Sequence, residues 1–424
     1  MRKPLPLLTK NKLMKIAVFS DTFSPKVDGV SISTHQFIAK LSEKGHKFII
    51  FCPSYSSDDI KEIKGNPVIR LSSLPLPSYP EIRMAVPSLN LIRDAMNDFD
   101  ADLVHFQTPG FIGQFSILAA KHFNLPVIGT YHTLVSKQGT YLSPYRLLKL
   151  DSLASLFEIN NPVLNLIESI SRTAEQLIAK PMIFSLCNSI YENANLILCP
   201  SRTIKEELKE AGIKTEMKVL SNGIDRKVFP GTEKKLSDGP FKILYAGRIS
   251  FEKNCDVVLN AFEIIHRRFP DATMTFAGNG PALDILKKTA KEKNIYDAVE
   301  FFGQIPHEQL FEIYKNHDLF MTASTMETQG MVVLEAVSSG LPCVGVNSHA
   351  LPELIHHGEN GYLSDEGDFK GMAEHAVQIL EDSSRYNAFS RKSIEISEEH
   401  DLDFSAGKLE QIYLSVSEIN VKSK

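Results

Sequence analysis

The sequence predicts an α/β protein made of two facing, doubly wound domains with a cleft between them. Short apolar runs alternate with stretches of helical periodicity along most of the 424 residues, which is typical of parallel βαβ units. The alternation breaks once, at Asn222–Pro240, where Gly, Pro and charged residues gather, and it then restarts. Because ligands bind beyond the carboxyl ends of parallel strands, we expect the chemistry in the loops that follow the strands.

The first run of units begins near residue 15. The run KIAVFS at Lys15–Ser20 predicts a buried strand, and Val30–Glu43 has helical spacing that stops at Gly45. A second apolar strand, Lys47–Cys52, completes a βαβ unit. Later elements of this domain are expected as strands at Leu103–Gln107, Pro126–Tyr131, Leu196–Pro200 and Lys218–Leu220, and as a helix at Phe115–Phe123.

The second run repeats the pattern after residue 240. Its strands are expected at Phe241–Ala246, Ala272–Ala277, Val299–Phe302, Leu319–Thr322 and Pro342–Val346. Its helices are expected at Asp256–Phe269, Ala282–Lys293, Gln309–Asn316 and Gly330–Ser339. A last helical stretch, Phe404–Val416, follows the acidic segment Glu395–Asp403.

Composition excludes several classes of function. Lys and Arg total 46 against 51 Asp and Glu, so the net charge of -5 offers no overall basic field for nucleic acid. The five cysteines form no C-x-x-C pair, which argues against a disulfide framework or a zinc site. No apolar run is long enough to span a bilayer, and Met1–Met14 lacks the apolar core of a secretory signal. We expect a cytoplasmic protein, with peripheral contact to the inner face of the membrane left open.

The segment Thr322–Gly345 is the richest in chemistry. A strand ends, a loop carries Glu327, Thr328 and Gln329, and Gly330 opens a helix whose amide donors and dipole would favour an anion. A carboxylate beside a phosphate would instead accept hydrogen bonds from neutral donors such as sugar hydroxyls. The plain alternative is that Glu327 caps the helix and Glu335 is solvated.

Cations follow another strand of the second domain. Arg248 and Lys253 lie five residues apart in AGRISFEKN, and two cations at one site would suit a leaving diphosphate. Two ordinary surface cations explain the same pattern. In the first domain, His132 follows a strand, and Gly29 lies at the start of the first long helix, where a phosphate could approach the backbone. A structural histidine and a tight turn are the alternatives there.

Together these segments resemble the retaining nucleotide-sugar glycosyltransferases of family four, which have the GT-B fold of two facing Rossmann-like domains. The match, from about Lys15 to Tyr413, is carried by E-x7-E at Glu327–Glu335, G-R-x-S-x-E-K at Gly247–Lys253, S-N-G-I-D at Ser221–Asp225, GNGP at Gly278–Pro281, YHT around His132 and the N-terminal DTFSPKVDGVS. The resemblance implies an acceptor-binding domain at 1–222, a nucleotide-sugar-binding domain at 223–395 and a helical segment at 396–424 that packs back toward the first domain.

The resemblance also implies roles for single residues. Arg248 and Lys253 would bind the donor diphosphate, and Glu327 would hold a hydroxyl of the donor sugar. His132 would sit beside the transferred sugar, and Gly29 would admit the diphosphate. The remaining donor contacts would come from Glu335 to the ribose, from the amides of Thr328, Gln329, Gly330 and Met331, and from Gly303, Gln304 and Ile305 beside the base.

Members of this family transfer a hexose with retention and need no divalent metal or other cofactor. The run Asp98, Asp100, Asp102 could indicate a metal-dependent transferase, but it precedes the strand Leu103–Gln107 and so lies at the wrong end of the sheet. The partners implied are a UDP- or GDP-sugar and a hydroxyl acceptor, and no nucleic acid. The residues do not distinguish the nucleotide, the sugar or the oligomeric state.

The acceptor is the least specified partner. The variant ETQG at Glu327–Gly330 and the segment Pro75–Ser88 look most like members that glycosylate lipids, such as diacylglycerol glucosyltransferases and phosphatidylinositol mannosyltransferases. The amphipathic stretch Tyr141–Leu150 could contact a membrane, or it could pack on its own domain. An insertion at about 150–188 has no counterpart in common members. A soluble or polysaccharide acceptor, and a silent sugar-nucleotide-binding protein, are the alternatives; a dehydrogenase is disfavoured because no complete G-x-G-x-x-G opens a helix.

Overall fold

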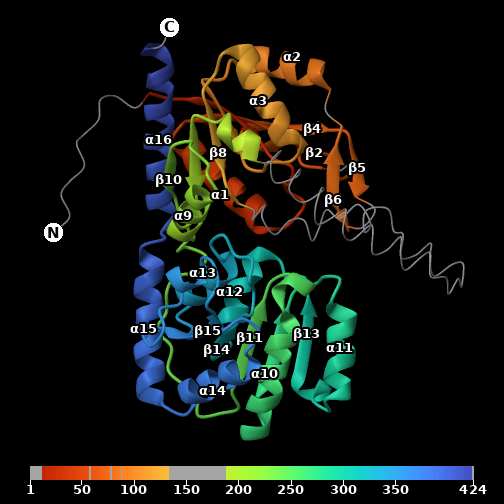
Figure 1. The fold of residues 1–424 in the computed structure, drawn as a ribbon, viewed down its shortest axis with the longest axis vertical. Helices are drawn as coiled ribbons and strands as arrows, with labels where there is room; N and C mark the ends of the chain where they lie inside the picture. Colours follow the sequence, from red (N-terminus) through yellow and green to blue (C-terminus); the bar gives the residue numbers. More distant parts are fainter. Residues whose placement is uncertain (1–11, 57–58, 77–78, 87, 133–187, 423–424) are drawn as a thin grey trace, which may run out of the picture. The chain divides into compact units, whose positions relative to one another are not determined.

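The computed structural model describes residues 12–56, 59–76, 79–86, 88–132 and 188–422, and it forms two α/β units (Figure 1). Unit 1 comprises the described residues up to Leu198 together with Ile213–Lys218 and the chain from Ala406 onward. Unit 2 comprises Cys199–Gly212 and Val219–Ser405. Each unit contains a largely or wholly parallel sheet, which confirms the α/β fold class. The limits at residues 222 and 395 that the sequence predicts stay a prediction.

The sheet of unit 1 has eight strands in the order β10-β9-β8-β7-β1-β2-β4-β3. The strands are β1 (Lys15–Phe19), β2 (Lys47–Pro53), β3 (Glu62–Ile63), β4 (Asn66–Leu71), β7 (Leu103–Phe106), β8 (Val127–Thr130), β9 (Leu196–Cys199) and β10 (Met217–Val219). β1 pairs in parallel with both β2 and β7, and the short β3 runs antiparallel to β4. Every residue of β7, β8 and β9 is buried, as expected for parallel strands covered on both faces.

Two helices of unit 1 begin at side-chain caps. The described residues of this unit include α1 (Gly29–Glu43), α2 (Leu89–Phe99) and α3 (Phe111–Phe123), and α3 begins at Gly110 without a side-chain cap. The Asp28 carboxylate accepts from the amide of Ser31 at 2.8 Å and so satisfies one of the orphan donors at the start of α1. A hairpin of β5 (Ser73–Leu76) and β6 (Tyr79–Ala85) was not expected from the sequence, because its prolines are unfavourable in a strand.

The sheet of unit 2 has six strands, all parallel, in the order β13-β12-β11-β14-β15-β16. They are β11 (Lys242–Ala246), β12 (Thr273–Ala277), β13 (Val299–Gly303), β14 (Leu319–Met321), β15 (Cys343–Val346) and β16 (Gly361–Ser364). The first strand lies in the middle, and the chain builds outward from it in one direction and then in the other. The order therefore reverses between β11 and β14, which is the switch point where ligands bind in such sheets.

Helices surround this sheet and bury its strands in one hydrophobic core (Figure 1). They are α10 (Cys255–Arg268), α11 (Leu283–Glu292), α12 (His307–Lys315), α13 (Met331–Ser338), α14 (Phe369–Leu380) and α15 (Ser383–Glu398), with short 3-10 turns at Phe251–Lys253, Tyr296–Ala298 and Leu351–Glu353. α9 (Arg202–Glu210) also clusters with unit 2 but adds no residue to this core. The expected strands and helices of this run are present within a few residues of their predicted ends. β16, α14 and α15 were not predicted.

The final helix, α16 (Leu402–Lys422), is longer than the stretch Phe404–Val416 that periodicity predicts. From Ala406 onward it clusters with unit 1. Its Glu410 carboxylate accepts from the Lys44 ammonium at 2.6 Å and lies 3.0 Å from Nε2 of His46. Its Tyr413 hydroxyl lies 2.7 Å from Nδ1 of His105, a buried residue of β7.

We predict that His105 makes folding stability depend on pH. Burial lowers the pKa of His105 to about 3, whereas an unfolded histidine titrates near 6.5. The unfolded chain therefore binds more protons between these values, and stability falls as the pH falls through that window. Between pH 7 and pH 5 the wild type should lose about 2 kcal/mol more unfolding free energy than His105→Gln, measured by urea unfolding. The surface variant His122→Gln should behave as the wild type, and an equal loss in His105→Gln would contradict the prediction.

Candidate functional site

The loops that follow β11 and β14 lie at the switch point of unit 2, because these two strands are paired neighbours in the sheet. The loop after β11 carries Arg248 and Lys253, and the loop after β14 carries Glu327. Parallel pairing places the carboxyl ends of both strands at the same edge. Two segments that lie some seventy residues apart in the sequence are thus brought together where an α/β sheet binds its ligand.

An ion pair joins these two loops. The Lys253 ammonium donates to Oε1 of Glu327 at 2.5 Å, and the two side chains are 23% and 14% exposed. Burial on its own raises the pKa of Glu327, but the charge and hydrogen bond of Lys253, helped by Ser324, outweigh it and hold that pKa below its usual range. Glu327 is therefore ionised at neutral pH and can only accept hydrogen bonds, which is what a partner for sugar hydroxyls must do.

The backbone around Arg248 is fixed by its neighbours. The Tyr245 hydroxyl donates to the carbonyl oxygen of Arg248 at 2.8 Å. On the other side, the GNGP turn packs directly on this loop: a Cβ added at Gly278 would come within 1.8 Å of the carbonyl oxygen of Gly247. Gly280 is confined in the same way by the backbone of Ile249. The glycines of this motif thus serve a close approach of two chains, which holds the loop that bears Arg248.

Gly330 determines how the loop after β14 enters α13. Its φ of +87° is left-handed, a conformation that glycine adopts without strain, and its carbonyl accepts the first bonds of the helix, from Val333 and Leu334. The amides of residues 328–331, which the family resemblance implies as donor contacts, belong to this turn and to the start of α13. We call residues Glu327–Met331 the 327–331 loop.

Glu335 lies inside α13 and is only 2% exposed. The Tyr314 hydroxyl, from α12, donates to its Oε2 at 2.8 Å and fixes the carboxylate. Burial, and then the charge of Glu335, raise the pKa of Tyr314 well above its ordinary value, so the phenol keeps its proton and remains a donor. The alternative of a solvated Glu335 is wrong, because this side chain is buried and hydrogen-bonded.

The segment predicted to flank the base lies on the same edge of the sheet. Gly303 ends β13, has a φ of +72° and forms a bridge with Gly278 of the GNGP turn. Gln304 and Ile305 follow, and Ile305 packs against the core of unit 2. The loops after β13, β12, β11 and β14 are consecutive along the sheet, so the structure gathers every candidate residue of unit 2 along one edge.

The two candidates of unit 1, Gly29 and His132, also follow strands. Gly29 starts α1 directly after the loop of β1, and His132 follows β8. Nε2 of His132 lies 3.0 Å from Oε1 of Gln107, at the end of β7, and with this amide oxygen as acceptor Nε2 carries the proton. Burial lowers the pKa of His132 to about 4, and the charge of Asp28 opposes this in part, so the ring is neutral at pH 7.

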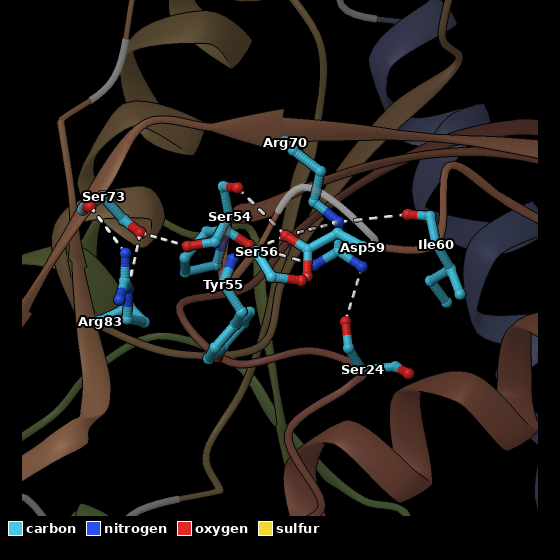
Figure 2. A network of polar contacts seen from close by, with 10 residues as sticks. Ser24, Ser54, Tyr55, Ser56, Asp59, Ile60, Arg70, Ser73 and Arg83 are labelled. Atoms are coloured by element: carbon cyan, nitrogen blue, oxygen red, sulfur yellow. Dashed lines mark hydrogen bonds and ion pairs between the residues drawn. The ribbon is translucent and has the colours of Figure 1, made fainter.

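A polar network braces the loop that leads to Gly29 (Figure 2). Arg70, on β4, donates to the carbonyl oxygens of Ser24 at 2.6 Å, Pro53 at 3.1 Å and Ile60 at 3.2 Å. Its charge-assisted bonds join the loop after β1 to the loop after β2. The same network reaches the β5–β6 hairpin, because the Ser73 hydroxyl donates to the carbonyl oxygen of Ser54. Within the hairpin, Arg83 donates to the hydroxyl and the carbonyl of Ser73 at 3.0 and 2.9 Å.

Sequence reasoning did not assign the positioning partners Gln107, Tyr314 and Arg70. Gln107 could have been noticed, because it ends a strand beside the one before His132. The residues next to Tyr314 and Arg70 in the sequence give no indication of their roles, because their partners lie far away in the chain. The stretches Tyr141–Leu150 and 150–187, on which the membrane and insertion interpretations rest, lie outside the described residues.

The acidic run before β7 lies at the opposite edge of the sheet, as expected. Asp102 accepts from the amide of Lys15, the first residue of β1, at 2.7 Å. Among the described residues, no group of three or more His, Cys, Asp or Glu side chains is arranged to hold a metal ion. The described part of the chain also contains no helix with the length and apolar character that crossing a membrane requires.

Two family models match consecutive parts of the chain. Glycosyltransferase family 4 matches residues 27–228, and glycosyl transferases group 1 matches residues 232–395. With two parallel α/β units and a site at the strand ends, these matches define a glycosyltransferase enzyme of the GT-B fold. The chain belongs to the family-four glycosyltransferases.

Named relatives extend this likeness over nearly the whole chain. An alpha-monoglucosyldiacylglycerol synthase of Streptococcus pneumoniae is 28% identical over 91% of this chain and 83% of its own length. An enzyme of the same name from Acholeplasma laidlawii is 22% identical over 96% of this chain and 99% of its own. Among solved structures, Anabaena HepE in complex with UDP superposes with a TM-score of 0.69 at 18% identity, covering 95% of this chain and all of that one.

We predict that Tyr314→Phe destabilises unit 2. The change leaves a buried carboxylate without its hydroxyl donor, which should reduce the unfolding free energy by about 1.5–3 kcal/mol in urea titrations. Tyr386→Phe is a matched control, because the buried Tyr386 hydroxyl has no hydrogen-bond partner among the described residues. That control should change stability by less than about 0.5 kcal/mol. Equal effects of both variants would show that the Tyr314–Glu335 bond contributes nothing.

Proposed function

We propose that this glycosyltransferase moves a hexose, with retention, from a UDP- or GDP-sugar to a hydroxyl of a membrane lipid. The observation that carries the donor half of this proposal is the Lys253–Glu327 ion pair at the switch point of unit 2, on the loop that also bears Arg248. It combines a cation for phosphate with an ionised acceptor for hydroxyls in one place. A nucleotide-diphosphate sugar has both kinds of group close together.

In this proposal Arg248 and Lys253 neutralise the diphosphate, whose charge grows as its bond to the sugar breaks. The amides of the 327–331 loop and the positive end of α13 add hydrogen bonds to phosphate or sugar. Glu335, held by Tyr314, takes the ribose hydroxyls, and the segment Gly303–Ile305 flanks the base. Because HepE was crystallised in complex with UDP, UDP is the first nucleotide to test.

Unit 1 would supply Gly29 and His132 to the transferred group and its phosphates. His132 is neutral at pH 7, so its part is to hold a hydroxyl rather than to deliver a proton. We propose that a donor phosphate oxygen takes the proton of the acceptor on the same face, which gives retention. We also propose that no divalent metal is needed, since the two cations fill the role that a metal would have at the diphosphate.

A lipid acceptor is supported by two observations. The first is the name of the S. pneumoniae and A. laidlawii relatives, which denotes a synthase acting in glucosyldiacylglycerol formation. The second is the β5–β6 hairpin, where Leu74 and Met84 are cross-strand partners and both are exposed, and where Val86 follows with 57% exposure. Adjacent exposed apolar side chains on a monomer are typical of a contact surface, and a lipid interface would cover them.

Replacing both cations tests the donor site. Arg248→Ala combined with Lys253→Ala should lower hexose transfer at least about a hundredfold and abolish the thermal stabilisation by UDP or GDP. Transfer is measured with a radiolabelled donor in the presence of EDTA, and the anomeric configuration of the product is read by NMR. The control pair Lys288→Ala and Lys315→Ala removes two exposed cations of the same unit and should leave turnover unchanged. Full transfer by the double Arg248, Lys253 variant would refute the assignment.

Vesicle binding tests the acceptor half. The protein should sediment with vesicles that contain anionic lipid, and less so as salt rises. Leu74→Glu combined with Val86→Glu should weaken this association about tenfold or more, because apolar area is lost and negative charge is added. Ile285→Glu, an equally exposed apolar position on α11 of unit 2, is the control. No association at low salt, together with efficient transfer to a soluble acceptor, would rule out the lipid proposal.

A further inference from the structure

The side chain of Gln329 is buried and hydrogen-bonded to residues outside its own loop. It is 2% exposed, so its amide would cost about 1–3 kcal/mol unless hydrogen bonds replaced those to water. Oε1 accepts from the amide of Asn222 at 2.9 Å, and Nε2 donates to the hydroxyl of Ser221 at 2.6 Å. The backbone amide of Asn222 can only donate, so it fixes which end of the Gln329 amide faces it.

Ser221 extends this contact to His400. Its hydroxyl oxygen accepts from Gln329 and from the amide of Gly223 at 3.1 Å, so its own proton is left to donate to Nδ1 of His400 at 2.9 Å. Nδ1 of His400 also lies 3.3 Å from Nε2 of Gln329. One glutamine thus touches two segments that lie about 180 residues apart in the sequence.

Both segments belong to unit 2 and lie within about five residues of a boundary with unit 1. After an earlier stretch of unit 2 at Cys199–Gly212, the chain returns to this unit between Lys218 and Val219 and leaves it between Ser405 and Ala406. Within unit 2 the segments 221–224 and 400–402 hold each other by two backbone bonds, from the amide of Ile224 to the carbonyl of His400 at 2.8 Å and from the amide of Leu402 to the carbonyl of Ile224 at 3.1 Å. We call these two stretches the crossing segments.

We propose that Gln329 is a positioning residue that couples the 327–331 loop to the crossing segments, so that a nucleotide-sugar bound at the loop also orders the passage between the units. The proposal rests on the proposed donor site. Its physical basis is that the backbone of Gln329 lies in the donor loop, while both ends of its side chain are bonded to the crossing segments. A ligand that orders the loop therefore also stabilises the hydrogen bonds that the backbone amides of Ile224 and Leu402 donate. Loosening those hydrogen bonds in turn weakens ligand binding at the loop.

Hydrogen exchange with and without saturating UDP measures this coupling; GDP is used if UDP gives no thermal stabilisation. In the wild type, nucleotide should slow amide exchange in the 327–331 loop and in both crossing segments. Gln329→Met has a similar volume and no hydrogen-bonding amide. It should raise the nucleotide Kd about tenfold and, at saturation, keep protection of the loop while losing protection of the crossing segments.

A second variant and a matched control separate coupling from general destabilisation. Ser221→Ala should lose the same ligand-dependent protection while leaving the 327–331 loop unaltered in sequence. Ser390→Ala also removes a buried hydroxyl of unit 2 that accepts from a backbone amide, that of Lys234 at 2.7 Å, and it should keep the wild-type pattern.

Each remaining result would overturn a defined statement. Protection of the crossing segments that persists in both Gln329→Met and Ser221→Ala would overturn the coupling while leaving the donor site intact. If nucleotide protects only the 327–331 loop in the wild type, the coupling is likewise overturned and the donor site is left intact. A wild-type loop that neither UDP nor GDP protects would overturn the proposed donor site, and the coupling with it.

Discussion

The parallel pairing of β11 with β14 is the constraint on which the site of unit 2 depends. Parallel strands bring all their carboxyl ends to one edge, so the loops that bear Lys253 and Glu327 have to meet there. Without that pairing the two charges would be distant groups on separate loops. The flanking strands β12 and β13 then add the glycine turn and Gly303 at the same edge. The chemistry of the unit therefore follows from its topology.

The ion pair has an electrostatic consequence for a ligand. Removing a carboxylate and an ammonium from water is costly, and their mutual attraction compensates only when the geometry is good, as it is between Lys253 and Glu327. The contact with Lys253 keeps Glu327 ionised and fixes the positions of both groups. For the donor that we propose, little rearrangement would remain at the moment of binding, which is how a preorganised site gains transition-state stabilisation.

Local periodicity predicted most of the fold, because apolar runs and helical spacing are properties of neighbouring residues. It missed the β5–β6 hairpin, whose prolines contradict a strand, and β16, whose residues Tyr362 and Leu363 are only half-buried. The loops with Arg248, Glu327 and His132 could be found because polar residues follow strands there. The partners that hold them could not. Tyr314 and the side chain of Gln329 act through contacts made by tertiary packing, which no sequence window contains.

The position of α16 in the chain affects the order in which unit 1 can fold, because this helix follows unit 2 in sequence but packs with unit 1. The first strands of unit 1 precede unit 2 in the chain, yet Tyr413 and Glu410, which complete the surroundings of His105 and His46, follow it. Until then the apolar surface that later receives α16 stays open to water. Unit 1 is thus completed only after unit 2 has been made, and a fragment that ends after β10 would lack part of its own core.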